Sequence, residues 1–100
     1  MIGDENTIVS KVGIGTGCLC NISTFMDMGC DVSIVCDDGA SYWSDLKFAM
    51  DAGHTVIRVN HGTSEELGMI TMTEYINSQL DPIKAQYLPH KFEVKMVGNK

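Results

Sequence analysis

The segment Asn60-His61-Gly62-Thr63-Ser64-Glu65-Glu66 carries the side chains of this chain that are best suited to bind a metal ion. His61 and Glu65 lie four residues apart, and Gly62 between them permits a tight bend. An imidazole nitrogen and a carboxylate oxygen together suit zinc, iron or manganese. The spacing therefore predicts a divalent metal ion held by His61 and Glu65. In the alternative interpretation, Glu65 only interacts with the helix dipole and His61 forms a hydrogen bond within the loop.

Glu66 has a structural interpretation of its own. Thr63 and Glu66 stand in the T-x-x-E relation of a capping box, in which the hydroxyl and the carboxylate satisfy free N–H groups at the start of a helix. This pattern predicts that Glu66 belongs to the helix cap, which leaves Glu65 as the carboxylate for the metal.

Two other loops carry polar groups that suit a ligand. A glycine turn after the first predicted strand looks like half of a phosphate-binding loop, although Cys20 stands where the full G-x-G-x-x-G pattern needs its last glycine. The acidic turn after the second predicted strand offers carboxylates, but it is also an ordinary turn before a helix. The candidate residues for binding an anion or nucleotide are Gly15, Thr16, Gly17, Asp37 and Asp38. The alternative is that they serve only the turns.

Strands and helices alternate along the sequence. Residues 12–17 are predicted to form a short strand that runs into a glycine-rich turn, and two further strands are predicted over residues 31–36 and 55–60. Each is followed by apolar residues at helical spacing. The second helix is expected to bury Trp43, and the third carries Met69, Met72, Ile76 and Leu80 before Pro82. The pattern predicts an α/β fold of repeated β-α units, with a mainly parallel sheet flanked by helices.

The last predicted strand and an internal repeat complete this organisation. Lys91 to Val97 alternates apolar and charged residues, which predicts an edge strand that can run antiparallel. Met26–Val32 aligns with Met50–Val56 at an offset of 24, so the same β-α step is taken twice.

Loops that follow parallel strands meet at the carboxyl edge of the sheet, where open α/β folds bind ligands. The three polar loops are therefore expected to share one edge.

The composition argues against two classes, membrane-spanning proteins and nucleic-acid-binding proteins. With 100 residues, 44% hydrophobic and 20% charged, we predict a single domain without a membrane-spanning segment. The polar, acidic start differs from a signal peptide, which predicts a cytoplasmic protein. The net charge of −6 and seven scattered basic residues argue against nucleic-acid binding.

The four cysteines match no common zinc pattern and are expected to be free thiols, mostly buried. His54 and His90 are interpreted as structural or surface residues.

These residues resemble the C-terminal half of the Nif-three-like family, also described as type 2 homologues of GTP cyclohydrolase I. The resemblance covers about Val12 to Leu80 and includes Gly29-Cys30-Asp31-Val32 and the helix end at Gly53. Its most specific part is Asn60-His61-Gly62-Thr63-Ser64-Glu65. The resemblance implies that His61 and Glu65 are ligands of a two-metal centre and that the chain self-associates as a homo-oligomer.

The chain departs from the family pattern in two respects. The family's remaining ligands, a His-His pair and an aspartate, belong to an N-terminal half, and this sequence has no His-His pair. Trp43 stands where the family has a histidine. The resemblance therefore implies two alternatives, a fragment of a larger Nif-three-like protein or a reduced member of the family.

Three functions remain open at this point. The first is a metal-binding domain, acting as a divalent-metal-dependent hydrolase if it is an enzyme. The second is a non-catalytic regulatory module that binds an anion or nucleotide. The third is a structural oligomerisation domain.

Overall fold

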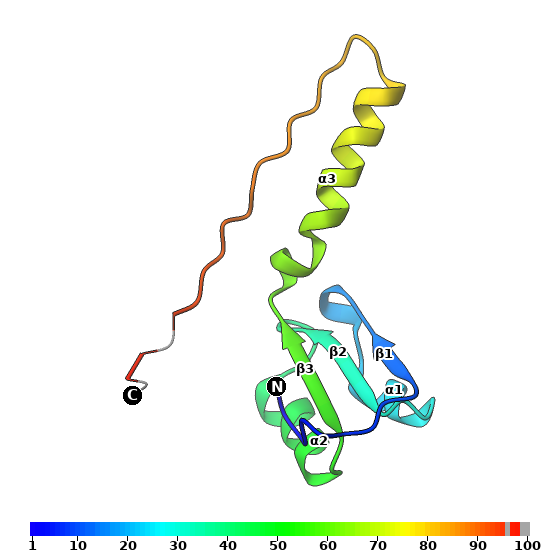
Figure 1. Cartoon of the computed structure of the whole chain (residues 1–100), viewed down its shortest axis with the longest axis vertical. Helices are drawn as coiled ribbons and strands as arrows, with labels where there is room; N and C mark the ends of the chain where they lie inside the picture. The colour runs from blue at the N-terminus through cyan, green and yellow to red at the C-terminus, as the bar shows by residue number, and fades with distance from the viewer. Residues whose placement is uncertain (96, 99–100) are drawn as a thin grey trace. The chain divides into compact units, whose positions relative to one another are not determined.

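A computed structural model describes residues 1–95 and 97–98, and the chain divides into two compact units, Met1–Ser64 and Glu65–Lys100. The first unit is built on three strands in the order β1-β2-β3 (Figure 1). These strands are β1 (Val12–Ile14), β2 (Val32–Cys36) and β3 (Thr55–Val59). Both strand pairs are parallel, which confirms the predicted parallel sheet of an α/β fold.

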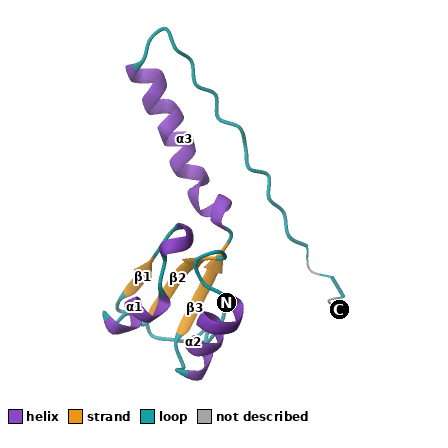
Figure 2. Ribbon diagram, turned by 180° about the vertical axis from the view of Figure 1, so that it is seen from behind, coloured by secondary structure: helices purple, strands orange, loops and turns teal. Residues whose placement is uncertain are grey.

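Short helical segments connect the strands. After β1 come a 3-10 turn, η1 (Gly17–Leu19), and α1 (Ile22–Asp27), and after β2 come a π-helical turn, η2 (Tyr42–Leu46), and α2 (Lys47–Asp51). Right-handed crossovers between strands that advance in one direction place both helices on the same face of the sheet. Figure 2 shows α1 and α2 on that shared face.

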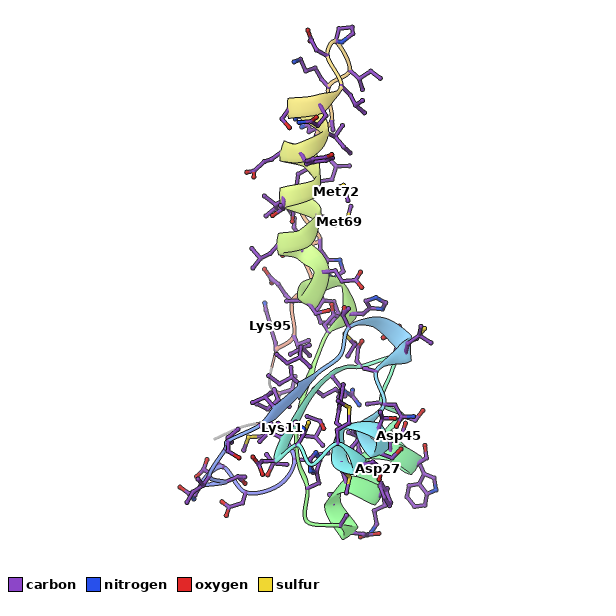
Figure 3. All side chains as sticks on the ribbon, turned by 90° about the vertical axis from the view of Figure 1, so that its right-hand side faces the viewer. Lys11, Asp27, Asp45, Met69, Met72 and Lys95 are labelled. Carbon is purple, nitrogen blue, oxygen red and sulfur yellow. The ribbon has the colours of Figure 1, made fainter. Side chains whose placement is uncertain are left out.

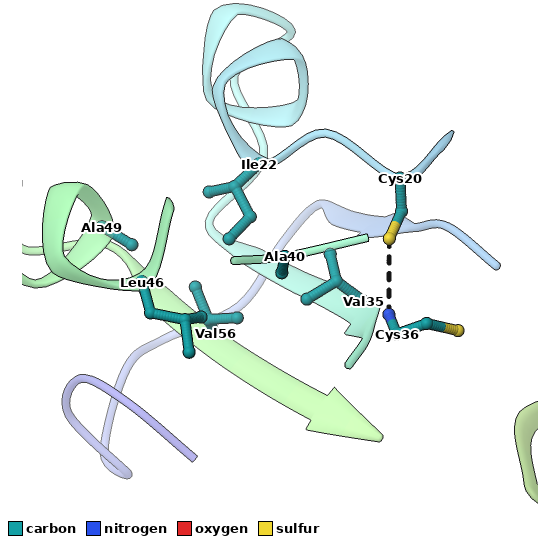
Figure 4. Close-up of a cluster of buried hydrophobic side chains, with 8 residues drawn as sticks. All are labelled: Cys20, Ile22, Val35, Cys36, Ala40, Leu46, Ala49 and Val56. Carbon is teal, nitrogen blue, oxygen red and sulfur yellow. Dashed lines mark hydrogen bonds between the residues drawn. The ribbon is translucent and has the colours of Figure 1, made fainter. Parts of the chain in front are cut away.

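The core of the first unit lies between this face and the helices (Figure 4). Val35 of β2, Val56 of β3 and Ala49 of α2 belong to this core cluster, and all three side chains are buried. The other members of the cluster are Cys20, Ile22, Cys36, Ala40 and Leu46. Small and β-branched side chains fill the space, so α1 and α2 lie close to the strands.

The expected burial of Trp43 is wrong. Its side chain is 78% exposed, and that of Met50 in α2 is 59% exposed. A straight α-helix would align Trp43 with Leu46 and Met50, but the segment starts as a π-helical turn. The wider turn changes which positions face the sheet. Leu46 and Ala49 are buried, whereas Trp43 and Met50 are not.

The aligned segments at an offset of 24 form matching turns from a helix into a strand. Gly29 and Gly53 have φ angles of +73° and +69°, a region that favours glycine. The next residue in each turn donates its N–H five residues back, from Cys30 to Phe25 and from His54 to Ala49, both at 2.9 Å. This is the hydrogen-bond pattern of a Schellman helix end.

An antiparallel pairing occurs at the N-terminal segment. Ile2 and Val56 exchange two backbone hydrogen bonds of 2.8 and 2.9 Å, so Ile2 lies along the outer edge of β3. The C-terminal edge strand predicted over Lys91–Val97 is not confirmed. Residues 91–95 and 97 are in no strand, and residue 96 lies outside the described part of the chain.

The third helix, α3 (His61–Gln79), begins in the first unit and continues into the second. Within the second unit, the chain after α3 returns along the helix, because Asn77 forms hydrogen bonds with both the N–H and the C=O of Ala85. Met69 and Met72 of the predicted apolar stripe are exposed on α3 (Figure 3). Within residues 1–95 and 97–98, no helix has the length and apolarity needed to cross a membrane.

Candidate functional site

The acidic turn after β2 and the start of α3 are joined at the carboxyl edge of the sheet. One carboxylate oxygen of Asp37 accepts the backbone N–H of His61 at 3.0 Å, and the other accepts the side-chain amide of Asn60 at 3.0 Å. The N–H of Asp37 in turn donates to the carbonyl of Val59 at 2.9 Å. Asp37 therefore fixes the backbone from which the His61 side chain projects.

The electrostatics of Asp37 agree with this role. Burial opposes ionisation of the carboxyl group, but the hydrogen bonds from His61 and Asn60 outweigh it and lower the pKa of Asp37. A carboxylate that accepts two N–H groups is stabilised in its charged form. Asp37 is therefore an anion at neutral pH and contributes negative charge beside His61.

Asp38 contacts the imidazole ring itself. Its Oδ2 lies 2.7 Å from Nδ1 of His61, with the two side chains 45% and 37% exposed, respectively. Two candidate residues from different loops of the sequence are thus brought together in space. The signal in the sequence was their position at the ends of two neighbouring parallel strands.

Glu65, the second predicted metal ligand, lies four residues after His61 in α3 and is exposed. Among residues 1–95 and 97–98, no group of three or more histidine, cysteine or acidic side chains is arranged to hold a metal ion. The donors available at this edge are nitrogen and carboxylate oxygen, which suit zinc, iron or manganese in chemistry but do not fill a closed site of about four ligands. The assignment of His61 and Glu65 as ligands remains a prediction.

The predicted capping box of Thr63 and Glu66 is wrong. Asn60 caps α3 instead, because its side-chain oxygen accepts the N–H of Thr63 at 3.0 Å, and the Thr63 hydroxyl donates to the same oxygen. Glu66 accepts hydrogen bonds from the hydroxyl of Tyr87 and the N–H of His90 within the second unit. Asparagine directly before a helix is a strong capping signal, and it was overlooked because the helix begins at His61.

The cap predicts a contrast between two variants. Asn60→Ala is expected to lower the free energy of unfolding by about 1 kcal/mol, because it removes the acceptor for the first turn of α3. Thr63→Ala is expected to change it by less than about 0.5 kcal/mol, since that hydroxyl only donates to Asn60. Urea denaturation of both variants measures the difference. A larger loss for Thr63→Ala would restore the capping box.

The glycine turn after β1 packs against buried thiols. The N–H of Gly17 donates to Sγ of Cys36 at 3.2 Å, and the carbonyl of Gly17 accepts from Cys20 at 3.1 Å. A Cβ atom on Gly15 would lie 2.3 Å from Cβ of Cys20. These contacts favour the interpretation in which the glycines serve a tight turn, and the anion site at Gly15, Thr16 and Gly17 has no support beyond its sequence pattern.

The four cysteines are free thiols, as predicted, with Cys18 exposed and the other three buried. Sγ of Cys36 lies 3.2 Å from the hydroxyl of Ser64, whose proton is donated to the carbonyl of His61 at 2.7 Å. The thiol of Cys36 is therefore the donor to Ser64. This contact ties the end of β2 to the first turn of α3.

His54 is structural, as predicted, but it is buried and paired. Its Nε2 lies 2.8 Å from the hydroxyl of Ser33, and the residues are 7% and 0% exposed. Burial lowers the pKa of His54, and the negative charge of Asp31 partly opposes this shift. His54 and Ser33 lie near the amino ends of β3 and β2, away from the edge that carries His61.

Comparison with known proteins finds no match for this chain among family models, curated proteins or solved structures. The resemblance to the Nif-three-like family therefore rests on the residues of this sequence alone.

Proposed function

We propose that this chain is a metal-binding domain that holds a divalent ion at the start of α3, with His61 and Glu65 as its ligands. The observation that carries the proposal is the double hydrogen bond of Asp37 to Asn60 and to the N–H of His61. A ligand whose backbone is held in advance loses less conformational freedom when a metal binds. The negative charge of Asp37 and Asp38 beside His61 also favours a cation over an anion.

The donor set limits what the metal would be. One imidazole and one carboxylate suit zinc, iron(II) or manganese rather than calcium, which prefers oxygen ligands alone. Since closed sites need about four ligands, water, another subunit or a further domain would supply the rest. The resemblance to Nif-three-like proteins, in which such a pair belongs to a two-metal centre, agrees with this view and with self-association.

The proposed chemistry is that of a metal-dependent hydrolase. A divalent ion in a partly open site lowers the pKa of water and polarises a bound oxygen. In this chain, His61 and Glu65 would hold the ion, and Asp37 would keep the first of them in place. The acidic surroundings oppose the alternative of an anion- or nucleotide-binding regulatory module at Asp37 and Asp38.

Metal content tests the proposal directly. The purified chain is equilibrated with zinc, iron(II) or manganese, and the bound metal is quantified by elemental analysis after removal of free ions. We expect His61→Ala and Glu65→Ala each to weaken binding at least about tenfold, because even changes in outer-shell residues cost 10- to 100-fold.

Matched variants control for nonspecific binding. His90→Ala and Glu93→Ala remove the same residue types from an exposed segment of the second unit and are expected to leave metal binding unchanged. Equal, near-zero metal in the wild type and all four variants under metal-replete conditions would refute the proposed function. Stabilisation by nucleotides without any metal dependence would favour the regulatory module.

A further inference from the structure

We propose that the face of the sheet opposite α1 and α2 is a docking surface for an amphipathic helix of another protein, one with an apolar stripe bordered by lysine or arginine. The proposal does not depend on the metal-binding function, because it concerns the face of the sheet and not its carboxyl edge. It commits to a basic helix because this surface combines an apolar floor with acidic side chains at one end.

The floor consists of two rows of side chains that run across the three strands. Successive residues of a strand point to opposite faces, and Val35 and Val56 belong to the buried core on the helix side. Their neighbours in sequence therefore point to the other face. The register of the two strand pairs gives the rows on that face as Val12-Val32-Thr55 and Ile14-Ile34-Ile57.

Much of this floor is exposed to solvent. Ile14 is 72% exposed, Val12 44% and Ile57 37%. Scattered apolar residues are ordinary at protein surfaces, whereas a contiguous apolar patch marks an interaction site. Parallel sheets occur almost only with helices on both faces, but α1 and α2 of the first unit both lie on the other face (Figure 2). A helix is therefore the element that fits this surface.

The N-terminal segment turns the floor into a groove. The hydroxyls of Thr7 and Thr55 lie 2.8 Å apart, and the Thr7 hydroxyl donates to the carbonyl of Asp4 at 2.6 Å. These bonds hold the segment against the amino end of β3. The groove is lined by most of the floor together with Met1, Asp4, Glu5, Thr7 and Val9.

The charged side chains of the groove are acidic. Asp4 and Glu5 line it, and none of its described lining residues has a basic side chain. The lysine and arginine residues of the first unit are placed elsewhere. Lys11 donates to a carbonyl at the end of α1, Lys47 lies in α2, and Arg58 alternates to the helix side of β3. A partner with lysine or arginine beside its apolar stripe therefore complements the groove in charge.

The same charges disfavour a second copy of this chain as the occupant. A two-fold contact brings the same patch of both copies together, so Asp4 and Glu5 of each copy would enter one interface. The long helix α3 is no better matched, because it carries three glutamates and no lysine or arginine. Like charges brought together at an interface oppose binding.

A model helix of defined charge tests the proposal. The probe is a fluorescein-labelled peptide of leucine and lysine at helical spacing, and its binding to the full chain is followed by fluorescence anisotropy in the presence of a metal chelator. We expect binding that weakens as salt is added, because ions screen the attraction to Asp4 and Glu5. A peptide with glutamate in place of lysine is expected to bind at least about tenfold more weakly.

Two variants locate the site. Ile14→Thr removes exposed apolar surface but keeps a β-branched residue, and it is expected to weaken binding of the leucine-lysine peptide about tenfold. Glu5→Gln should weaken it about two- to fivefold at low salt and reduce its salt dependence. The matched controls are Ile83→Thr in the second unit and Asp27→Asn in α1, and both should bind as the wild type does.

Three outcomes would overturn the proposal. One is equal affinity for the two peptides, and another is wild-type affinity in Glu5→Gln and in a folded Ile14→Thr. The third is a dimer of the wild type, seen by sedimentation, that dissociates in Ile14→Thr, because a second copy would then occupy the face. The chelator keeps all of these results separate from the metal-binding function.

Discussion

Gly15→Ala is expected to lower the free energy of unfolding of the first unit by about 3 kcal/mol, at the upper end of the usual cost of overpacking. The added Cβ would lie 2.3 Å from Cβ and 3.0 Å from Cα of Cys20, and 3.1 Å from the ring of Phe25. Because Cys20 is buried and its α-carbon is involved, rotation of a side chain cannot relieve the clash. Urea denaturation, followed by circular dichroism, measures the loss, which is a large part of the roughly 5–15 kcal/mol of a typical domain.

Gly68→Ala is the matched control for this prediction. Gly68 lies within α3, nothing approaches the position of its Cβ within 4 Å, and its φ angle is not positive. Alanine there should stabilise the helix by about 0.5–1 kcal/mol, because glycine loses more conformational freedom on folding. A Gly15→Ala variant as stable as the wild type would show that the turn after β1 is not packed against Cys20 as described.

Acidification from pH 7 to pH 5 is expected to destabilise the first unit through His54. Burial lowers the pKa of His54 in the fold, and the charge of Asp31 only partly offsets this. In the unfolded chain the same histidine takes up a proton near pH 6.5, so the unfolded state binds more protons below that pH. The contribution of His54 is therefore fully present above about pH 6.5 and is lost as the pH falls below it.

The free energy of unfolding, measured in urea at pH 5, 6, 7 and 8, tests this dependence. His54→Gln is expected to be less stable at pH 7, because it disturbs the buried hydrogen bond with Ser33. A buried polar group that is left without its hydrogen-bond partner costs about 1–3 kcal/mol. It should also show a smaller decrease between pH 7 and 5, whereas the exposed His90→Gln should retain the wild-type slope. An unchanged slope in His54→Gln would refute the assignment.

A separate loss of stability, through Asp31, is expected at lower pH. Hydrogen bonds from Ser10 and Lys11 lower the pKa of Asp31, so its contribution is present above its unfolded pKa and is lost only as the pH falls toward the lower folded value. The effect of His54 between pH 7 and 5 can therefore be measured before Asp31 begins to titrate.

The parallel sheet was predictable because its strands have a clear local signal. Val32–Cys36 and Thr55–Val59 are rich in β-branched residues and are separated by helical spacing and glycine, which leaves few alternatives. Trp43 was not predictable in the same way, because periodicity assumes 3.6 residues per turn, and a π-helical turn violates that assumption. The pairing of Ile2 with Val56 has no local signal at all, since it joins distant parts of the chain.

The candidate site was likewise predictable only in part. The position of Asp37, Asp38 and His61 at one edge followed from the topology, since parallel strands send their loops to the same side. The sequence could not show which of the two aspartates contacts the His61 ring. That choice depends on the backbone conformation of the turn after β2. Asn60 was missed because the capping interpretation was given to Thr63, two positions inside the helix that actually forms.

The pairing of Ile2 with Val56 has a consequence for the order of folding. Val12 pairs with Val32, and Val32 pairs with Thr55, so these contacts close much shorter loops than the one between Ile2 and Val56. Longer loops cost more entropy to close, and contacts distant in sequence slow the search for the native state. During synthesis, Ile2 cannot pair with Val56 until β3 has left the ribosome. The N-terminal segment is therefore expected to join the sheet late, after the parallel strands have assembled.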